Sequence, residues 1–397
     1  MQFSSFSISR LPRIIFGSGK INDVPSLAAH YGRKALLVTG KQSFTATPRW
    51  ATFTQALEAQ SINWLHFTVS GEPSPSLVDQ AVSQFRSEAI DVVIAIGGGS
   101  VLDAAKAIAG LLPHGNSVMD HLEGVGKNIV YTGPSTPFIA VPTTAGTGSE
   151  ATKNSVLSIQ GADGFKKSFR DECLIPEYAV VDPDLLVSCS TALMAADGMD
   201  AFTQLLESYA SLKANPFTDA LAWSGMTAVK DGFFMAWEGK EPKASHGRAC
   251  MAYAALLSGI TLAQVGLGSV HGLASPLGAY FPIPHGVVCG TLVAAATEVN
   301  IQAMQAREPN NPALAKYAQV GRLLSGDQTL DDTAARSVLI ALLNEWSERL
   351  QLARLNSYGI SADDFPRIVA DSRGSSMQTN PIKLTDEEIK HILVKRL

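Results

Sequence analysis

The sequence predicts an N-terminal α/β domain, a parallel sheet flanked by helices, followed by an all-helical C-terminal domain. Short apolar runs alternate with helical patterns over roughly the first 185 residues, which is typical of a parallel sheet covered by helices. Beyond Pro183 the strand patterns largely disappear and long helical patterns follow one another. A chain of 397 residues also exceeds the usual size of a single core. We therefore divide it into residues 1–185 and 186–397.

The elements of the first domain follow from their local patterns. Residues 3–16 mix polar and β-forming side chains and predict a strand or hairpin. Residues 91–96, DVVIAI, are the clearest parallel strand, because the run is short, apolar and β-branched without polar alternation. The other predicted strands are 34–39, 63–69, 138–142 and 178–181, and the predicted helices are 50–59 and 76–86.

The second domain is expected to consist of helices. Residues 251–268 are apolar enough to resemble a membrane span, but Ser258, Gly259 and Gln264 interrupt them and the length is marginal. We interpret this stretch as a buried core helix. The predicted helices are 192–212, 216–232, 247–268, 290–304, 312–324, 333–350 and 385–394.

Composition and charge exclude several classes of partner and compartment. Asp and Glu number 36 against 31 Lys and Arg, and no basic cluster is present, which argues against nucleic acid or an anionic membrane as partner. The N-terminus lacks the pattern of a signal peptide. We therefore expect a cytoplasmic protein with reduced core thiols. The cysteines are far apart and form no CxxC pair: Cys173, Cys189, Cys250 and Cys289.

A glycine turn follows the clearest strand. The residues Gly97, Gly98, Gly99 and Ser100 stand between strand 91–96 and a strongly helical run. Glycines allow the backbone to approach an anion, and the free N–H groups of a helix start carry partial positive charge. The segment differs from the usual GxGxxG fingerprint. The alternative is a tight turn closed by a capping box from Ser100 to Asp103, and the motif alone does not separate the two.

A second candidate loop, TTAGTGSEAT at 143–152, follows strand 138–142. Its small hydroxyl residues, among them Thr143, Thr144 and Thr147, can surround a ligand, although a flexible surface loop would have a similar composition. Parallel α/β sheets bind ligands at the carboxyl ends of their strands. Two such loops on neighbouring strands therefore favour a nucleotide site.

The segment 269–291 contains His271 and His285. It lies within 249–299, where Glu298 is the only charged residue, so both histidines are expected to be buried. The segment is broken by several glycines and prolines, and we expect it to form a rigid irregular pocket wall rather than one helix. The alternative is that each histidine makes ordinary core hydrogen bonds.

Asp200 and Gln204 stand at i and i+4 and thus share one face of a predicted buried helix. Together with His271 and His285 they would supply a carboxylate, an amide oxygen and two imidazoles. Such a set suits a divalent first-row metal. Alternatively, Asp200 is a helix N-terminal charge paired with the backbone.

Four sequence motifs, in their order along the chain, resemble those of the iron-containing (group III) alcohol dehydrogenases. The resemblance covers roughly 16–300 and is carried by GGGSVLDAAKAIA at 97–109, PTTAGTGSEAT at 142–152, ADGMDA at 196–201 and the HG(x)₃PLG(x)₅PHG spacing at 271–286. It implies a dehydroquinate synthase-like architecture, with a dinucleotide-binding domain, a helical domain and a metal between them. It also implies reversible interconversion of an alcohol with an aldehyde or ketone.

The family's metal ligands, one aspartate and three histidines, fall on Asp200, Gln204, His271 and His285. One ligand histidine is therefore Gln204 here, and a second active-site histidine is replaced by Ser275. The resemblance implies Asp200, His271, His285 and Ser275 as catalytic residues and Fe²⁺ or Zn²⁺ as the metal, with its occupancy left open.

The expected coenzyme is NAD(P), with NADP favoured. Relatives that prefer NAD carry an aspartate after the first strand, whereas Gly40 stands here, near Lys41 and Ser43. An aspartate would repel a 2′-phosphate, and these residues would not. The expected coenzyme contacts are Gly40, Lys41, Ser43, Gly97, Gly98, Gly99, Ser100, Asp103, Thr143, Thr144, Thr147 and Lys166.

The sequence thus predicts a homodimeric enzyme that acts on a small-molecule alcohol or aldehyde. Two alternatives stay open. The replaced histidines also suit a metal-independent reductase resembling the maleylacetate reductases. Intact glycine loops beside an altered catalytic site would also suit a nucleotide-binding subunit without turnover.

Overall fold

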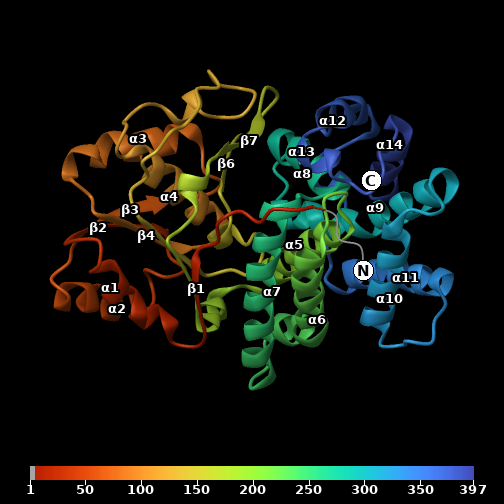
Figure 1. The fold of residues 1–397 in the computed structure, drawn as a ribbon, viewed down its shortest axis with the longest axis horizontal. Helices are drawn as coiled ribbons and strands as arrows, with labels where there is room; N and C mark the ends of the chain where they lie inside the picture. Colours follow the sequence, from red (N-terminus) through yellow and green to blue (C-terminus); the bar gives the residue numbers. More distant parts are fainter. Residues whose placement is uncertain (1–4) are drawn as a thin grey trace.

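The computed structural model describes residues 5–397 and contains an α/β half followed by a helical half (Figure 1). In the described residues the main sheet has six parallel strands in the order β1-β8-β5-β4-β2-β3, and β6 and β7 form a separate antiparallel pair. The predicted fold class is confirmed. The strands are β1 Arg13–Phe16, β2 Lys34–Gly40, β3 Asn63–Val69, β4 Val92–Gly97, β5 Phe138–Pro142, β6 Asn154–Ile159, β7 Phe165–Arg170 and β8 Tyr178–Val181.

Side chains of the main sheet alternate between two apolar layers. Leu36 and Val38 face one cluster with helices α3 and α4, while Ala35 and Leu37 face the other with α1 and α2. Burial on both faces explains why the strands are continuous apolar runs. The helices of this half are α1 Val24–Ala28, α2 Pro48–Ala59, α3 Pro75–Phe85 and α4 Gly99–Leu111.

Two expectations for the first half were wrong or incomplete. Of the described residues within 3–16, only Arg13–Phe16 are a strand, and it pairs in parallel with β8 instead of forming a hairpin. Residues 3 and 4 of that segment lie outside the described part. The β6–β7 pair was not predicted, because β7 reads FKKSFR and its charged residues hide the apolar alternation.

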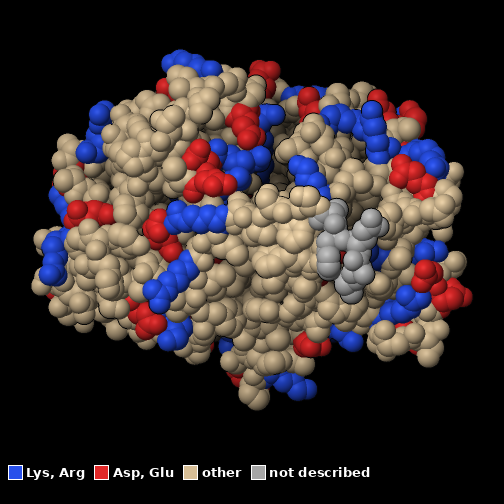
Figure 2. All heavy atoms as spheres, viewed as in Figure 1, with Lys and Arg blue, Asp and Glu red and all other residues tan. Residues whose placement is uncertain are grey.

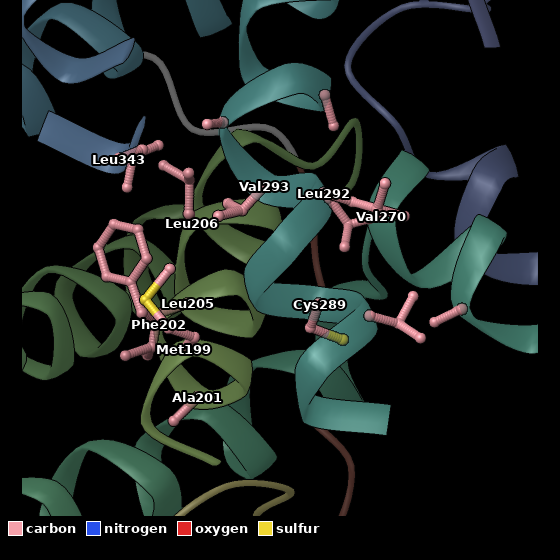
Figure 3. Close-up of a cluster of buried hydrophobic side chains, with 14 of the residues drawn as sticks. Met199, Ala201, Phe202, Leu205, Leu206, Val270, Cys289, Leu292, Val293 and Leu343 are labelled. Carbon is pink, nitrogen blue, oxygen red and sulfur yellow. The ribbon is translucent and has the colours of Figure 1, made fainter. Parts of the chain in front are cut away.

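The helical half packs around one large apolar cluster (Figure 3). Met199, Phe202 and Leu205 of α5 lie beside Leu292 and Val293 of α9 in that view. The helices are α5 Thr191–Ala210, α6 Pro216–Glu238, α7 Lys243–Val265, α8 Ser269–Tyr280, α9 His285–Arg307, α10 Pro312–Ser325, α11 Asp332–Arg349, α12 Phe365–Asp371, α13 Ser375–Gln378 and α14 Asp386–Lys395.

The segment 269–291 is not one helix, as expected, but the expectation of an irregular wall was wrong. The segment consists of helix α8, a short break at 281–284 and the start of α9, and Pro276 lies inside α8. An interior proline costs about 3 kcal/mol, but tertiary packing supplies most of the stability of a protein helix. Most of α8 is buried, and this burial offsets the loss. Helix α9 begins at His285 rather than at 290, with Pro284 as its N-cap residue.

Helices α7 and α9 are each long and apolar enough to cross a membrane by composition alone. In the apolar window of α9, 83% of the residues are buried inside the protein, and in that of α7, 61%. This burial supports the interpretation of 251–268 as a core helix and is consistent with a soluble protein.

The two halves meet where the loop after β5 touches helix α7. An added Cβ at Gly259 would lie 2.1 Å from the carbonyl oxygen of Gly148, so the two backbones are in direct contact. Strand β8 ends at Val181 and α5 begins at Thr191. The division near residue 185 falls between these elements and remains our interpretation.

Candidate functional site

Side chains from three helices converge on one point of the helical half; two of them are buried, whereas the side chain of His285, which was expected to be buried, is 25% exposed. Asp200 comes from α5, His271 from α8 and His285 from α9. The Oδ1 atom of Asp200 lies 3.2 Å from Nε2 of His271 and 3.7 Å from Nε2 of His285. Cys289, one turn beyond His285, places Sγ 3.5 Å from Nε2 of His271. The donor atoms of these four residues all lie within 4.8 Å of one another.

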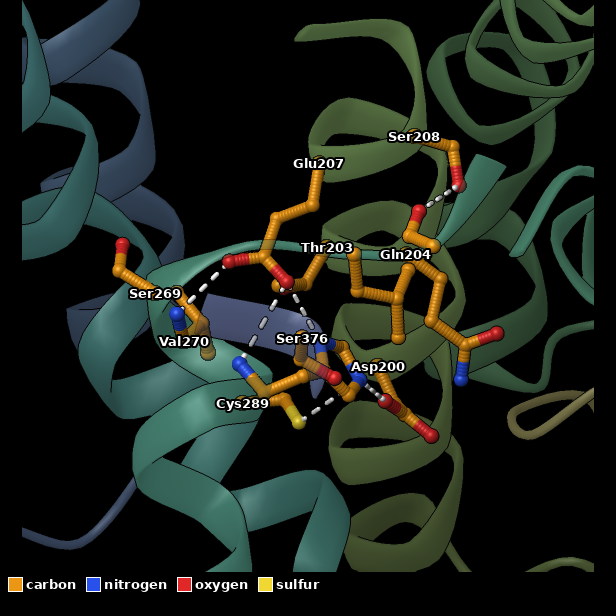
Figure 4. A network of polar contacts seen from close by, with 12 residues as sticks. Asp200, Thr203, Gln204, Glu207, Ser208, Ser269, Val270, Cys289 and Ser376 are labelled. Atoms are coloured by element: carbon orange, nitrogen blue, oxygen red, sulfur yellow. Dashed lines mark hydrogen bonds and ion pairs between the residues drawn. The ribbon is translucent and has the colours of Figure 1, made fainter. Parts of the chain in front are cut away.

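A second buried carboxylate orients His271. The Nδ1 atom of His271 donates to Oε2 of Glu207 over 2.7 Å, and the backbone N–H of Val270 donates to Oε1 over 2.7 Å (Figure 4). This hydrogen bond turns Nε2 of His271 toward Asp200. A carboxylate behind a histidine is a common support for a metal ligand. The sequence prediction missed Glu207. The available signal was its spacing of seven residues from Asp200, which places both carboxylates on one face of the same helix.

Gln204 lines the cavity beside His271, as its place on the helix predicts. Its Oε1 atom accepts a hydrogen bond from Oγ of Ser258 over 2.9 Å. The prediction that Gln204 is a metal ligand stays a prediction. The sequence prediction also missed Cys289. The signal was its i+4 spacing from His285, which carries no meaning unless α9 begins before residue 290.

Burial and mutual charge shift the pKa values of these groups in different directions. Burial raises the pKa of the Cys289 thiol to about 12 and lowers the pKa of His285 to about 4 despite the attraction of Asp200. Burial also acts to raise the pKa of Asp200, but the charge of His285 and the hydrogen bond from His271 outweigh it and hold that pKa well below its usual range. The cluster thus keeps Asp200 ionised and His285 neutral, whereas Cys289 keeps its proton at neutral pH.

Burial opposes the charged form of His271 as well. Its contacts with Cys289, Asp200 and Glu207 outweigh that effect and raise its pKa well above the ordinary value. Nearby, burial and the charge of Asp200 raise the pKa of Asp197 to about 8. Two carboxyl groups one turn apart therefore differ in charge at neutral pH, because only Asp200 has imidazole partners.

The cluster opens into a cavity of about 440 Å³ between the two halves, a typical size for a small-molecule site. Charged side chains of both signs surround the hollow in Figure 2. The predicted site residues that line this cavity are Gly99, Ser100, Asp103, Thr147, Lys166, Gln204, His271, Ser275 and His285.

An adjoining cavity of about 1080 Å³ extends along the carboxyl edge of the sheet. It shares Gly99, Lys166 and His285 with the smaller one, so the two spaces meet at the cluster. The predicted residues that line it are Gly40, Lys41, Ser43, Gly98, Gly99, Ser100, Thr144, Thr147, Lys166, Asp200 and His285.

Two of the predicted coenzyme contacts lie outside both cavities. Gly97 and Thr143 line neither of these cavities, and the N–H of Thr143 donates to the carbonyl of Gly97. The capping-box alternative was wrong, because Gly98 is the N-cap residue of α4 and makes no side-chain cap. Asp103 instead accepts hydrogen bonds from Oγ of Ser149 and the N–H of Val156.

Whether a metal fits this cluster depends on its donor atoms. One carboxylate, two imidazoles and one thiol suit a borderline divalent ion such as Zn²⁺ or Fe²⁺. Among the described residues, Nδ1 of His285 is buried without a hydrogen-bond partner, whereas its Nε2 faces the cluster. The residues present therefore fit a metal. Fold and site together define a protein with an α/β half, a helical half and a candidate metal centre beside a glycine-loop cavity.

Comparisons with known proteins identify the family. The family description "Iron-containing alcohol dehydrogenase" matches residues 12–183, and "Fe-containing alcohol dehydrogenase family, C-terminal" matches residues 194–397. The chain is 32% identical over 382 residues to alcohol dehydrogenase 4 of Schizosaccharomyces pombe, covering 95% of this chain and 86% of that protein. It is 30% identical over 400 residues to the NADPH-dependent butanol dehydrogenase of Clostridium saccharobutylicum, covering 96% of each.

A solved structure agrees with these relatives. The crystal structure of a 1,3-propanediol oxidoreductase superposes with a TM-score of 0.89 at 28% identity, covering 99% of this chain and 100% of that one. The chain therefore belongs to the iron-containing alcohol dehydrogenase family and is an enzyme of alcohol oxidoreduction.

Proposed function

We propose that the enzyme reversibly converts a small-molecule alcohol into an aldehyde or ketone by hydride transfer with NAD(P), using a divalent metal. The observation that carries this proposal is the meeting of the two cavities at Lys166 and His285, beside the Asp200 cluster. A coenzyme along the sheet edge and a substrate in the smaller cavity would then be in contact.

The coenzyme phosphates are assigned to the N-terminus of α4. Gly98 and Gly99 allow close approach of the backbone, and the start of α4 at Gly99 and Ser100 lines the larger cavity. The first N–H groups of a helix carry partial positive charge and bind phosphate. Lys166 lines both cavities and makes an ion pair with Glu72 over 3.3 Å. Its ammonium group adds positive charge where the two spaces join.

When bound, the nicotinamide supplies the hydride acceptor or donor, and the metal acts as a Lewis acid on the substrate oxygen. Asp200, His271 and His285 would hold the metal, with Glu207 fixing the orientation of His271. Asp200 contributes a negative charge from a fully buried position.

Ser275 takes the place of a histidine at the cavity wall. Its Oγ donates to the carbonyl oxygen of Lys166 over 3.2 Å. The lone pairs of the hydroxyl can accept a hydrogen bond from a substrate hydroxyl or a water molecule. We assign to Oγ of Ser275 the role of passing on the hydroxyl proton of the substrate.

NADP is proposed as the favoured coenzyme. Gly40 ends strand β2 beside Lys41 and Ser43, and all three line the larger cavity. No aspartate stands at this strand end to repel a 2′-phosphate. The relative from Clostridium saccharobutylicum, whose name states NADPH dependence, is consistent with this choice. The proposal includes a homodimer in the cytoplasm.

The test is the change of coenzyme absorbance on metal-loaded enzyme, with small aldehydes plus NADPH or NADH and with small alcohols plus NADP⁺ or NAD⁺. We expect activity with both coenzymes and a higher kcat/KM with NADPH. In Lys41→Ala the KM for NADPH should rise about tenfold with little effect on NADH, whereas Lys390→Ala, exposed on α14, should change neither.

Each alternative has its own outcome. Coenzyme binding without any turnover would identify a nucleotide-binding protein. Activity that survives complete chelation would identify a metal-independent reductase. A tenfold preference for NADH would refute the coenzyme assignment alone.

A further inference from the structure

The sulfur of Cys289 lies where a fourth metal ligand would be expected. It is buried on α9, and Sγ lies 3.5 Å from Nε2 of His271 and 3.8 Å from Nε2 of His285. Figure 4 draws a contact of the Cys289 sulfur as a dashed line. Cys289 is also part of the apolar cluster in Figure 3. Its sulfur, however, is in contact with the imidazole nitrogens, which a purely apolar role would not require.

The distances match those of a coordination shell. In a tetrahedron with metal–ligand bonds of about 2.0–2.3 Å, the ligand atoms are about 3.3–3.8 Å apart. The Oδ1 atom of Asp200 is 3.2 Å and 3.7 Å from the two imidazole nitrogens. With the two sulfur distances, four edges of the tetrahedron therefore have suitable lengths, and the remaining two are below 4.8 Å.

Gln204 is a weaker candidate for the same place. Its amide oxygen accepts the hydrogen bond from Ser258, so it would have to share its remaining lone pair with the metal or turn away from Ser258. An amide oxygen is also a poor partner for a borderline metal compared with a thiolate. Cys289 needs no such rearrangement, because Sγ already faces both imidazoles.

We propose that Cys289 is the fourth protein ligand of the metal, with Asp200, His271 and His285, and that Gln204 lies outside the shell. The substrate oxygen would then add as a fifth ligand from the cavity side. This inference deepens the proposed function and rests on it for the presence of a metal in this cleft. The thiol loses its proton to solvent as the metal–sulfur bond forms. A thiolate is a soft ligand, so the site should favour Zn²⁺ over Fe²⁺.

X-ray absorption at the zinc edge of the loaded enzyme tests the shell directly. We expect one sulfur scatterer at about 2.3 Å with nitrogen and oxygen at about 2.0–2.2 Å. In Cys289→Ser the sulfur shell should vanish. The Co²⁺-loaded parent should show a thiolate-to-cobalt absorption band, a measurement that needs no variant and holds if Cys289→Ser fails to fold.

Metal affinity separates Cys289 from Gln204. In a competitive chelator titration, Cys289→Ser should bind Zn²⁺ about 10–100-fold more weakly than the parent, whereas Gln204→Ala should stay close to it. Cys250→Ser is the matched control, because Cys250 lies on α7 outside the cluster.

A parent shell of nitrogen and oxygen alone would overturn the inference, as would a loss of affinity confined to Gln204→Ala. Neither outcome depends on turnover. A sulfur-containing shell in an enzyme that oxidises no alcohol would count against the proposed function while supporting the ligand assignment.

Discussion

Glu150 illustrates how a single buried carboxyl couples stability to pH. It lies in the loop after β5 and is only 3% exposed. Burial raises its pKa to about 7, although its own backbone N–H and the charge of Lys106 oppose the shift. Between pH of about 4.5 and 7 the folded protein therefore holds a proton that the unfolded chain has lost. The contribution of Glu150 to stability therefore falls as pH rises through this window.

Replacing Glu150 with Gln should remove this dependence. The amide keeps the shape of the side chain and cannot ionise. We expect the variant to become more stable than the parent as pH rises from about 4.5 to about 7, by about 2–3 kcal/mol at the upper end. Thermal unfolding across this pH range measures it, with Glu345→Gln on the exposed side of α11 as the control for lost charge. Parallel curves for Glu150→Gln and the parent would contradict the assignment.

At the scale of elements, the β4–α4 turn separates a binding role from a structural one. An added Cβ at Gly98 would lie 3.1 Å from the Thr144 side chain, at the wall of the larger cavity. An added Cβ at Gly97 would meet Val101 at 2.5 Å, away from either cavity lining. The two glycines are adjacent and serve different purposes.

Gly98→Val should therefore fold and lose coenzyme affinity by about tenfold or more, because the side chain blocks the approach of phosphate to the backbone. Gly97→Ala should instead lower the melting temperature. Titration of coenzyme fluorescence, with circular dichroism as the check on folding, distinguishes them. Unchanged affinity in Gly98→Val would return the segment to a simple turn.

At the scale of the whole molecule, the site depends on how closely the two halves approach. The contact between Gly148 and Gly259 leaves no room for a methyl group, because an added Cβ at Gly259 would lie 2.1 Å from a backbone oxygen. The same loop carries Thr144 and Thr147 of the larger cavity. A shift of this loop would therefore move the coenzyme wall relative to His285.

Gly259→Ala should destabilise the protein by about 1–3 kcal/mol through overpacking and also lower kcat/KM. Thermal unfolding and steady-state kinetics measure the two effects. Gly278→Ala is the control for stability, because its added carbon would have its nearest neighbour at 3.7 Å. A Gly259→Ala variant with the parent's melting temperature would contradict this prediction, because the loop at Gly148 would then move aside at little cost.

The sequence alone determined the class of fold and most of its strands. Strands β4 and β2 are continuous apolar runs because both of their faces are buried. Such a run can be recognised in the sequence without knowledge of its neighbours. The family motifs likewise located Asp200, His271 and His285, since spacing along the chain identifies them. The antiparallel β6–β7 pair escaped because its charged residues carry no clear alternation.

Only the tertiary structure decided how the site is completed. The sequence treated Cys289 as an ordinary core thiol and did not consider Glu207, yet both contact His271. It also predicted an irregular wall where α8 and α9 are helical. Local patterns report what a segment prefers, whereas burial against other helices outweighs the cost of Pro276 and sets the distances between side chains far apart in sequence. Residue types name the possible ligands, and those distances determine which of their atoms can share a metal.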